Sequence, residues 1–142
     1  MTPMEFVLLW EGYKSDDSRD PGGRTLFGLS SRCYKSEVDA WWDLPYDEAK
    51  GNTIEIYERD YWSKAGCECL PQPLAFVVFN AAVNCGVGRA KRWLIDCRGN
   101  WRDFLHLQLC HYAALKKPMF LAGWLNRTLD CWAQARRLEV ST

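Results

Sequence analysis

The stretch PLAFVVFNAAVNCGVG, residues 73–88, is apolar on every face apart from two asparagines. A helix that is hydrophobic all round is buried, so this stretch predicts a central helix around which the rest of the chain packs. Gly86 is suited to end that helix. Asn80 and Asn84 lie four residues apart, which places both amides on one side of the helix, facing a polar feature of the core.

Helical patterns lie on both sides of this stretch. Apolar residues at helical spacing predict a helix over residues 3–13 and another from Pro45 to about Trp62. Three further helices are predicted after the central one, at residues 89–96, 101–117 and 123–137. Residues 14–30 differ, because Asp-Pro-Gly-Gly is strong turn chemistry and RTLFGLS behind it has strand-like character. The sequence therefore predicts a mainly α fold around one buried central helix, with a small β-hairpin or irregular loop near residues 14–30.

The length and composition indicate one globular domain. The chain has 142 residues, of which 48% are hydrophobic and 25% are charged. No apolar run approaches the roughly 18 residues that a membrane span needs, so we expect no stable membrane insertion. Residues 1–142 are expected to form a single domain, and a monomer is expected.

The charge is balanced overall but divided unevenly along the chain. The formal net charge is zero, which argues against a nucleic-acid partner bound through bulk charge. Residues 1–88 carry 8 Lys and Arg against 14 Asp and Glu, and residues 89–142 carry 10 against 4. The basic C-terminal part could hold an anionic polymer, and its charges could equally be the solvated faces of helices.

The seven cysteines are an odd number, so a complete disulfide framework within one chain is excluded. Cys97, Cys110 and Cys131 lie in helix-like sequence, where a free thiol behaves as a small buried hydrophobe. Free thiols fit a protein made in a reducing cytoplasm, and we expect no export signal in residues 1–13. Cys67 and Cys69 form C-x-C rather than the C-x-x-C of common zinc sites. We expect no metal and no cofactor.

The stretch LLWEGYKSDDSRDPGGRTLFG, residues 8–28, is the candidate site for chemistry. Glu11 lies at the C-terminal end of the first predicted helix, which is unfavourable for an anion and favours the protonated carboxyl. Asp20 follows across a glycine-bearing turn, where it could face Glu11. Cleavage of a glycosidic bond needs two such carboxyl groups, one of them as general acid. Thr25 could orient the attacking water. Alternatively, the stretch from Glu11 to Thr25 could be an ordinary turn without any catalytic role.

Four further side chains are candidates for substrate binding. Trp10 and Tyr13 flank the predicted acid and could contact sugar rings. Asp17 could serve in place of Asp20, as could Asp16. Asn84 could reach the floor of a cleft, or be a satisfied amide of the core.

The segment EGYKSDDSRDPGGRTLFGLS resembles the opening motif of the glycoside hydrolase family 108 muramidases, a lysozyme-like group of phage and prophage peptidoglycan hydrolases. Later segments resemble family motifs in the same order, namely IYERDYW at 56–62, LPQPLAFVVFNAAVNCG at 70–86 and FLAGWLNR at 120–127. The resemblance implies a lysozyme-like catalytic domain without a separate wall-binding domain. Its partner would be the glycan strand of peptidoglycan.

The resemblance also assigns roles to residues of the opening stretch. The family's catalytic glutamate falls on Glu11, its motif aspartates on Asp17 and Asp20, and its motif threonine on Thr25. The implied reaction is hydrolysis of the β-1,4 bond between N-acetylmuramic acid and N-acetylglucosamine, with Glu11 as general acid. An inverting or a retaining outcome depends on the separation of the carboxyl groups.

Departures from the family pattern leave two alternatives open. Tyr13, Lys14, Asn80 and Cys85 replace residues that are usual in the family, and Trp10 replaces a histidine that often precedes the glutamate. A lytic transglycosylase would need only Glu11. A catalytically degraded wall-binding or phage structural module would keep the fold alone. In a phage setting, the protein would be made in the host cytoplasm and would act on the periplasmic wall after a separate protein opens the membrane.

Overall fold

The computed structural model describes residues 1–17, 19 and 22–141, and Ser18, Asp20, Pro21 and Thr142 lie outside the described residues. The described N-terminal elements are α1 (Pro3–Glu11), β1 (Lys14–Ser15), β2 (Thr25–Leu26), β3 (Leu29–Ser30), α2 (Lys35–Trp41) and α3 (Tyr46–Tyr57). A π-helix, η1 (Glu58–Ser63), and a 3-10 helix, η2 (Cys67–Cys69), follow. The remaining elements are α4 (Leu74–Cys85), α5 (Val87–Asp96), α6 (Trp101–Ala114) and α7 (Pro118–Val140). This composition confirms the predicted mainly α fold.

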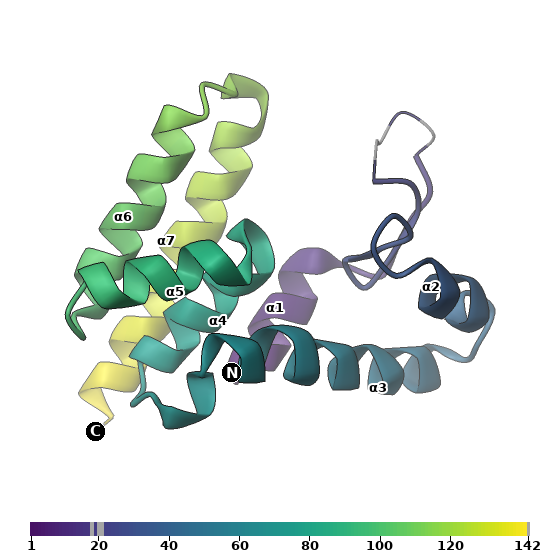
Figure 1. The fold of residues 1–142 in the computed structure, drawn as a ribbon, viewed down its shortest axis with the longest axis horizontal. Coiled ribbons are helices and arrows are strands. Elements are labelled where there is room, and N and C mark those ends of the chain that lie inside the picture. The colour runs from purple at the N-terminus through teal and green to yellow at the C-terminus, as the bar shows by residue number, and fades with distance from the viewer. Residues whose placement is uncertain (18, 20–21, 142) are drawn as a thin grey trace.

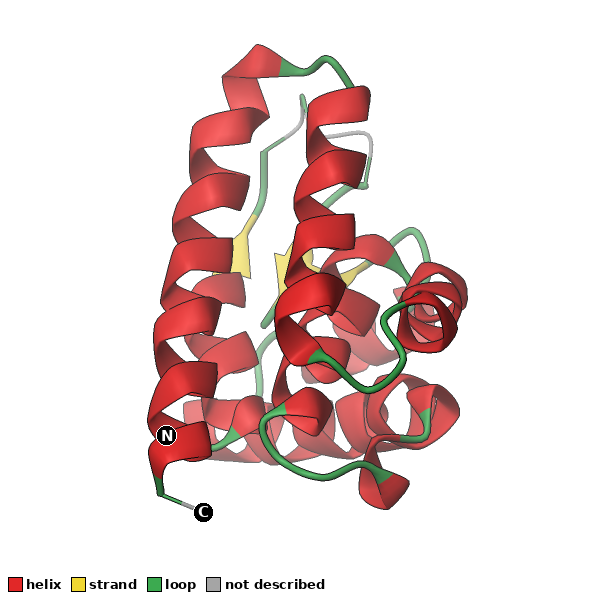
Figure 2. Ribbon diagram, turned by 90° about the vertical axis from the view of Figure 1, so that its left-hand side faces the viewer, coloured by secondary structure: helices red, strands yellow, loops and turns green. Residues whose placement is uncertain are grey.

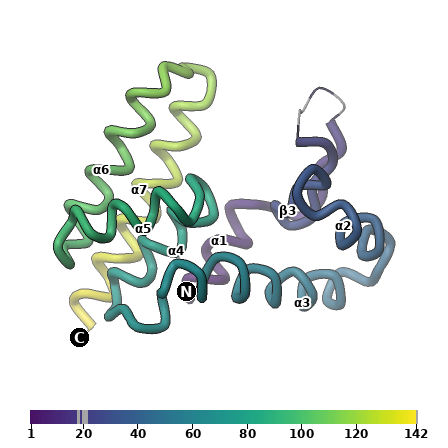
Figure 3. The backbone as a smooth tube through the Cα atoms, in the orientation of Figure 1, coloured from purple at the N-terminus to yellow at the C-terminus, as the bar shows by residue number. Residues whose placement is uncertain are grey.

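The elements gather at two ends of the molecule. The strands and α2 lie at one end and α4 to α7 at the other, and α3 runs along one side between them (Figure 1). The tube through the same view shows α1 in the middle, next to α4 (Figure 3). Helices α6 and α7 stand side by side as a long hairpin, behind which the strands are visible in the turned view (Figure 2). Hydrogen bonds of Trp10 and Glu11 to α7 hold the end of α1 against the last helix.

Helix α4 is the centre of the core, as the sequence predicts. All residues from Leu74 to Ala82 are buried, and the helix contacts α1, α5, α6 and α7. It ends where Gly86 adopts φ 96°, a conformation that favours glycine, and α5 begins at Val87. An apolar surface on all sides gives α4 partners on all sides, which explains its central position.

The predicted β element is a three-stranded antiparallel sheet in the order β1-β2-β3. Strand β1 pairs with β2 through Lys14 and Leu26, and Leu26 also faces Leu29 of β3. The turn between β2 and β3 consists of Phe27 at φ 47° and Gly28 at φ 84°. Positive φ at both central residues is typical of a type I′ hairpin turn. This turn projects towards the end of α1.

Some boundaries and one burial prediction differ from the structure. The last helix begins at Pro118 rather than at residue 123, since proline fits the first turn of a helix. The helix predicted to reach Trp62 continues as the π-helix after Tyr57. Cys97 and Cys131 are buried as predicted, but the prediction for Cys110 is wrong, because this thiol lies on the exposed side of α6 beside His106. No helix in the described part of the chain has the length and apolarity that a bilayer crossing requires.

Candidate active site

Glu11 is the last residue of α1, and its carboxylate pairs with a cation from the last helix. Nη1 of Arg127 donates to Oε1 of Glu11 over 2.8 Å. The Glu11 side chain is 21% exposed and that of Arg127 is 8% exposed. The carboxylate at the negative end of α1 thus has a counter-charge from α7 and still reaches solvent.

Arg127 is held from its other side by the central helix. Its Nε donates to Oδ1 of Asn80 over 2.9 Å, and both residues are buried. Of the two asparagines predicted to face a polar feature, Asn80 therefore faces Arg127, and Asn84 faces the hydroxyl of Tyr112. Its second terminal nitrogen, Nη2, is buried and has no hydrogen-bond partner among the described residues. A buried guanidinium needs partners to offset its desolvation, and Glu11 and Asn80 supply two.

The other oxygen of Glu11 lies against the hairpin turn. A Cβ atom placed on Gly28 would lie 2.7 Å from Oε2 of Glu11 and 2.6 Å from the hydroxyl of Tyr57. No side chain fits at this distance, and the φ of 84° also favours glycine. Gly28 therefore allows the turn to approach the carboxylate closely.

Tyr57, the last residue of α3, fastens this turn. Its hydroxyl donates to the carbonyl oxygen of Phe27 over 2.7 Å, and the side chain is buried. Burial, and then the negative charge of Glu11, raise the pKa of Tyr57 well above its usual range. The phenol therefore stays a neutral donor, and it ties α3 to the turn beside Glu11.

Two of the predicted partners of Glu11, Thr25 and Asp17, lie in the hairpin region. Asp20 lies outside the described residues. Thr25 begins β2, half-buried, opposite Ser15 and Ser30. Asp17 lies in the exposed loop, where Nε and Nη2 of Arg19 donate to its two oxygens over 3.0 Å and lower its pKa. In the described part of the chain, no hydrogen bond or ion pair joins Thr25 or Asp17 to Glu11.

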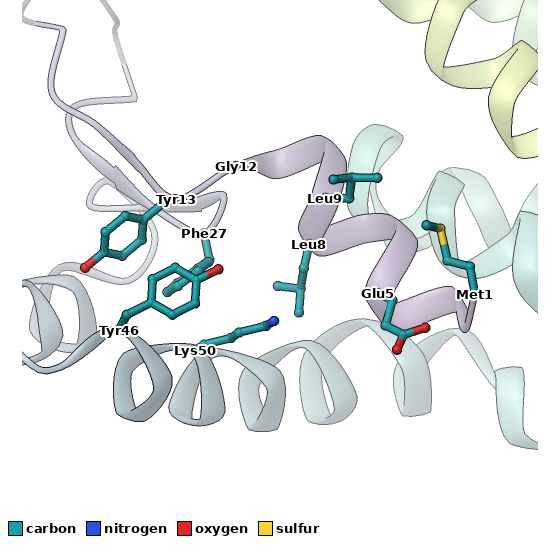
Figure 4. A pocket seen from close by; sticks show the side chains of 9 residues that line it. All are labelled: Met1, Glu5, Leu8, Leu9, Gly12, Tyr13, Phe27, Tyr46 and Lys50. Carbon is teal, nitrogen blue, oxygen red and sulfur yellow. The ribbon is translucent and has the colours of Figure 1, made fainter.

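The two aromatic residues that flank Glu11 point to different places. Nε1 of Trp10 donates to Oδ2 of Asp130 over 2.9 Å, which ties α1 to α7. Tyr13 packs at 4.9 Å, centroid to centroid, against both Phe27 and Tyr46. The three rings line a hollow of about 330 Å³ between α1 and α3. Figure 4 shows the side chains around it. Glu11 does not line that hollow, and the predicted role of Tyr13 in substrate binding stays a prediction.

Asn84 lies one turn after Asn80 on α4, and its Nδ2 donates to the hydroxyl of Tyr112 on α6. Nε2 of Gln108 donates to the same hydroxyl over 2.9 Å. Asn84 therefore has a hydrogen-bond partner in the core, and it lies one helical turn from Asn80, which binds Arg127. Its role as a substrate contact stays a prediction.

Sequence reasoning missed three residues that contact or support Glu11, namely Gly28, Tyr57 and Arg127. Arg127 ends the segment FLAGWLNR, but nothing local distinguishes it from the other arginines of this basic part of the chain. Gly28 and Tyr57 lie in two further segments that carry the resemblance. Among the described residues, no three His, Cys, Asp or Glu side chains are grouped to hold a metal.

The chain is similar to known proteins in both sequence and fold. A family model described as glycosyl hydrolase 108 matches residues 4–86. A solved structure of SagA from Brucella abortus is similar in fold, with a TM-score of 0.71 and 22% sequence identity. The similarity covers 95% of this chain and 92% of that chain. No curated protein matches the sequence. The family match includes Glu11, Gly28, Tyr57 and Asn80 and ends before α7, which supplies Arg127.

Proposed function

Because this chain belongs to the glycosyl hydrolase 108 family, we propose that it cleaves the β-1,4 bond between N-acetylmuramic acid and N-acetylglucosamine, with Glu11 as general acid. Family membership makes the chain a lysozyme-like glycoside hydrolase with peptidoglycan as its substrate. The observation that carries the proposed role of Glu11 is its partly exposed carboxylate, held between Arg127 and Gly28.

The two oxygens of Glu11 have different surroundings. Oε1 accepts from Arg127, whereas Oε2 lies beside the bare backbone of Gly28. In the proposed reaction, Oε2 gives its proton to the leaving glycosidic oxygen. The resulting carboxylate is then neutralised by the Arg127 guanidinium, which is already in place. A preorganised counter-charge of this kind lowers the cost of charge that develops during the reaction.

The second half of the reaction involves the hairpin loop. Asp20 would place the water or stabilise the oxocarbenium-like transition state, and the Thr25 hydroxyl would orient that water. The proposal extends to the setting that the family resemblance implies. In that setting a phage or prophage protein is made in the bacterial cytoplasm and reaches the periplasmic wall after another protein opens the membrane.

The test compares the wild type with Glu11→Gln on purified Gram-negative peptidoglycan, by turbidity loss and product mass. Glu139→Gln is the matched control, because Glu139 is also ion-paired with an arginine, Arg102, over 2.6 Å. We expect the wild type and the control to release fragments with reducing ends, and Glu11→Gln to lose at least about 100-fold in rate while remaining folded.

Three outcomes would contradict the proposal. Fragments that end in an anhydro sugar would indicate a lytic transglycosylase. Binding to the wall without any release by the wild type would indicate a binding module. Full activity of folded Glu11→Gln would move the general acid to another residue.

A further inference from the structure

Two aromatic residues lie on the same side of α7 as Arg127, the residue that pairs with Glu11. Phe120, Trp124 and Arg127 are spaced at i, i+4 and i+7, which places their side chains on the same side of a helix. Trp124 and Phe120 therefore lie about one and two helical turns, ~5.4 Å each, from Arg127 towards the α6–α7 connection. Leu129 lies on the opposite side of the same helix.

The two aromatic rings of this face lie in contact and are open to solvent to different degrees. Phe120 is 52% exposed, and its ring centroid lies 5.8 Å from that of Trp124 at an angle of 31°. Trp124 stacks on Tyr112 of α6, with centroids 4.9 Å apart and planes at 16°. Phe120 therefore extends the stacked pair of Tyr112 and Trp124 into solvent, where its ring is not part of the core.

A network of hydrogen bonds holds the ring of Tyr112, on which Trp124 stacks. Tyr112 is buried beneath Trp124, and its hydroxyl takes hydrogen bonds from Asn84 and Gln108. The thiol of Cys85 lies 3.3 Å from the same hydroxyl. A ring fixed at its hydroxyl end cannot turn freely, so the network holds the plane on which Trp124 stacks.

Gly123, next to Trp124, keeps the surface clear. It lies within α7, where glycine is unfavourable, and its φ is not in the left-handed region. A Cβ atom placed there would meet nothing within 4 Å, so no neighbour requires a glycine. The glycine therefore leaves the backbone of α7 open to solvent beside Trp124.

We infer that the α7 aromatic face, defined as Phe120 and Trp124 with Gly123 beside them, binds sugar rings of the glycan strand on one side of the bond that Glu11 cleaves. The inference rests on the proposed function and names a subsite for it. The flat apolar faces of sugar rings stack on aromatic side chains. The rings of Trp124 and Phe120 follow Arg127, the partner of Glu11, along one side of α7. The face lies in the segment FLAGWLNR, which resembles a family motif, and outside residues 4–86, the part that the family model matches.

The α7 aromatic face fits this occupant better than the hollow at Tyr13 does. The hollow is lined by Tyr13, Phe27 and Tyr46 but not by Glu11, and no described contact joins it to Arg127. The α7 aromatic face, by contrast, continues directly from Arg127.

The experiment measures binding and turnover separately. Binding of soluble peptidoglycan glycan fragments is measured by calorimetry in the Glu11→Gln background, and KM and kcat are measured in the otherwise wild-type protein. We expect Phe120→Ala to weaken binding and raise KM about tenfold, with kcat nearly unchanged. Leu129→Ala is the control, because Leu129 is 65% exposed on the opposite side of α7, and it should leave both quantities unchanged.

Gly123→Gln separates binding from folding. Glutamine favours a helix more than glycine does, so thermal stability should not fall, whereas the new side chain should block the sugar and raise KM. If the wild type degrades peptidoglycan while Phe120→Ala and Gly123→Gln keep its KM and its affinity for the fragments, the subsite inference is wrong. A wild type that does not degrade peptidoglycan would instead overturn the proposed function.

Discussion

Nη1 of Arg127 lies 2.8 Å from Oε1 of Glu11, so the last helix supplies the counter-charge for the last residue of the first helix. Nε of the same arginine contacts Asn80 on the central helix. Three helices thus meet at one guanidinium, and this contact positions the proposed general acid.

Arg127→Ala should both destabilise the protein and inactivate it. Removal of the guanidinium leaves the partly buried Glu11 carboxylate and the buried Asn80 amide without their partner. Breaking a buried pair from one side costs about 3–5 kcal/mol, which urea unfolding at neutral pH measures. Arg102→Ala is the control, because its pair with Glu139 is exposed and should contribute no more than about 1 kcal/mol. Equal losses in the two variants would contradict the importance assigned to Arg127.

Gly28→Ala should lower both stability and activity. The added methyl group would lie within 2.7 Å of the Glu11 carboxylate and the Tyr57 hydroxyl, so the turn has to move away. Gly66→Ala is the matched control, since Gly66 has φ 75° and its Cβ would meet nothing within 4 Å. Both variants should lose about 1 kcal/mol or more from backbone strain, and only Gly28→Ala should lose most of its turnover. Activity of Gly28→Ala at the Gly66→Ala level would refute the close approach.

The protein should lose stability in alkaline solution. Burial raises the pKa of Cys67 and of Cys131 to about 12, and burial with the charge of Glu11 raises that of Tyr57. Because these pKa values are higher in the folded state, the stabilisation is complete below the unfolded values of about 9 for thiols and about 10 for phenols. It is lost as the pH rises through the folded values. Urea unfolding from about pH 8 to about pH 11 should show a falling free energy of unfolding.

The alkaline prediction has an internal control. Cys131→Ala and Cys67→Ala remove one titrating group each, so each variant should show a shallower fall with pH than the wild type does. A free energy of unfolding that stays constant up to about pH 11 would show that these groups titrate alike in both states.

The two motif aspartates should differ in their effects. Asp20→Asn should lower kcat strongly, since the proposed function assigns the water or the oxocarbenium-like charge to this carboxylate. Asp17→Asn should change KM at most, because Asp17 is exposed and already paired with Arg19. Rates and product masses on peptidoglycan measure both. An Asp20→Asn variant that releases anhydro sugars at the wild-type rate would support the transglycosylase instead.

The sequence predicted the elements of the fold well because their signals are local. The apolar surface of residues 74–82 required a buried helix, and the glycine-rich turn chemistry required a break in the helices near residues 14–30. Boundaries were less certain, since Pro118 can end one helix or begin the next. Burial on a helix that is apolar on only part of its surface was also uncertain, as the exposed thiol of Cys110 shows.

The sequence by itself determined a mainly α fold around α4, and it singled out Glu11 as the candidate acid. Only the tertiary structure decided which cation and which turn surround that acid. Arg127 is buried against Glu11 while Arg136 and Arg137 are exposed, although all three belong to the same basic helix. Local patterns report periodicity and turn chemistry over a few residues. Contacts between α1, α4, α7 and the β2–β3 turn depend instead on how whole helices pack, which no short stretch of sequence contains.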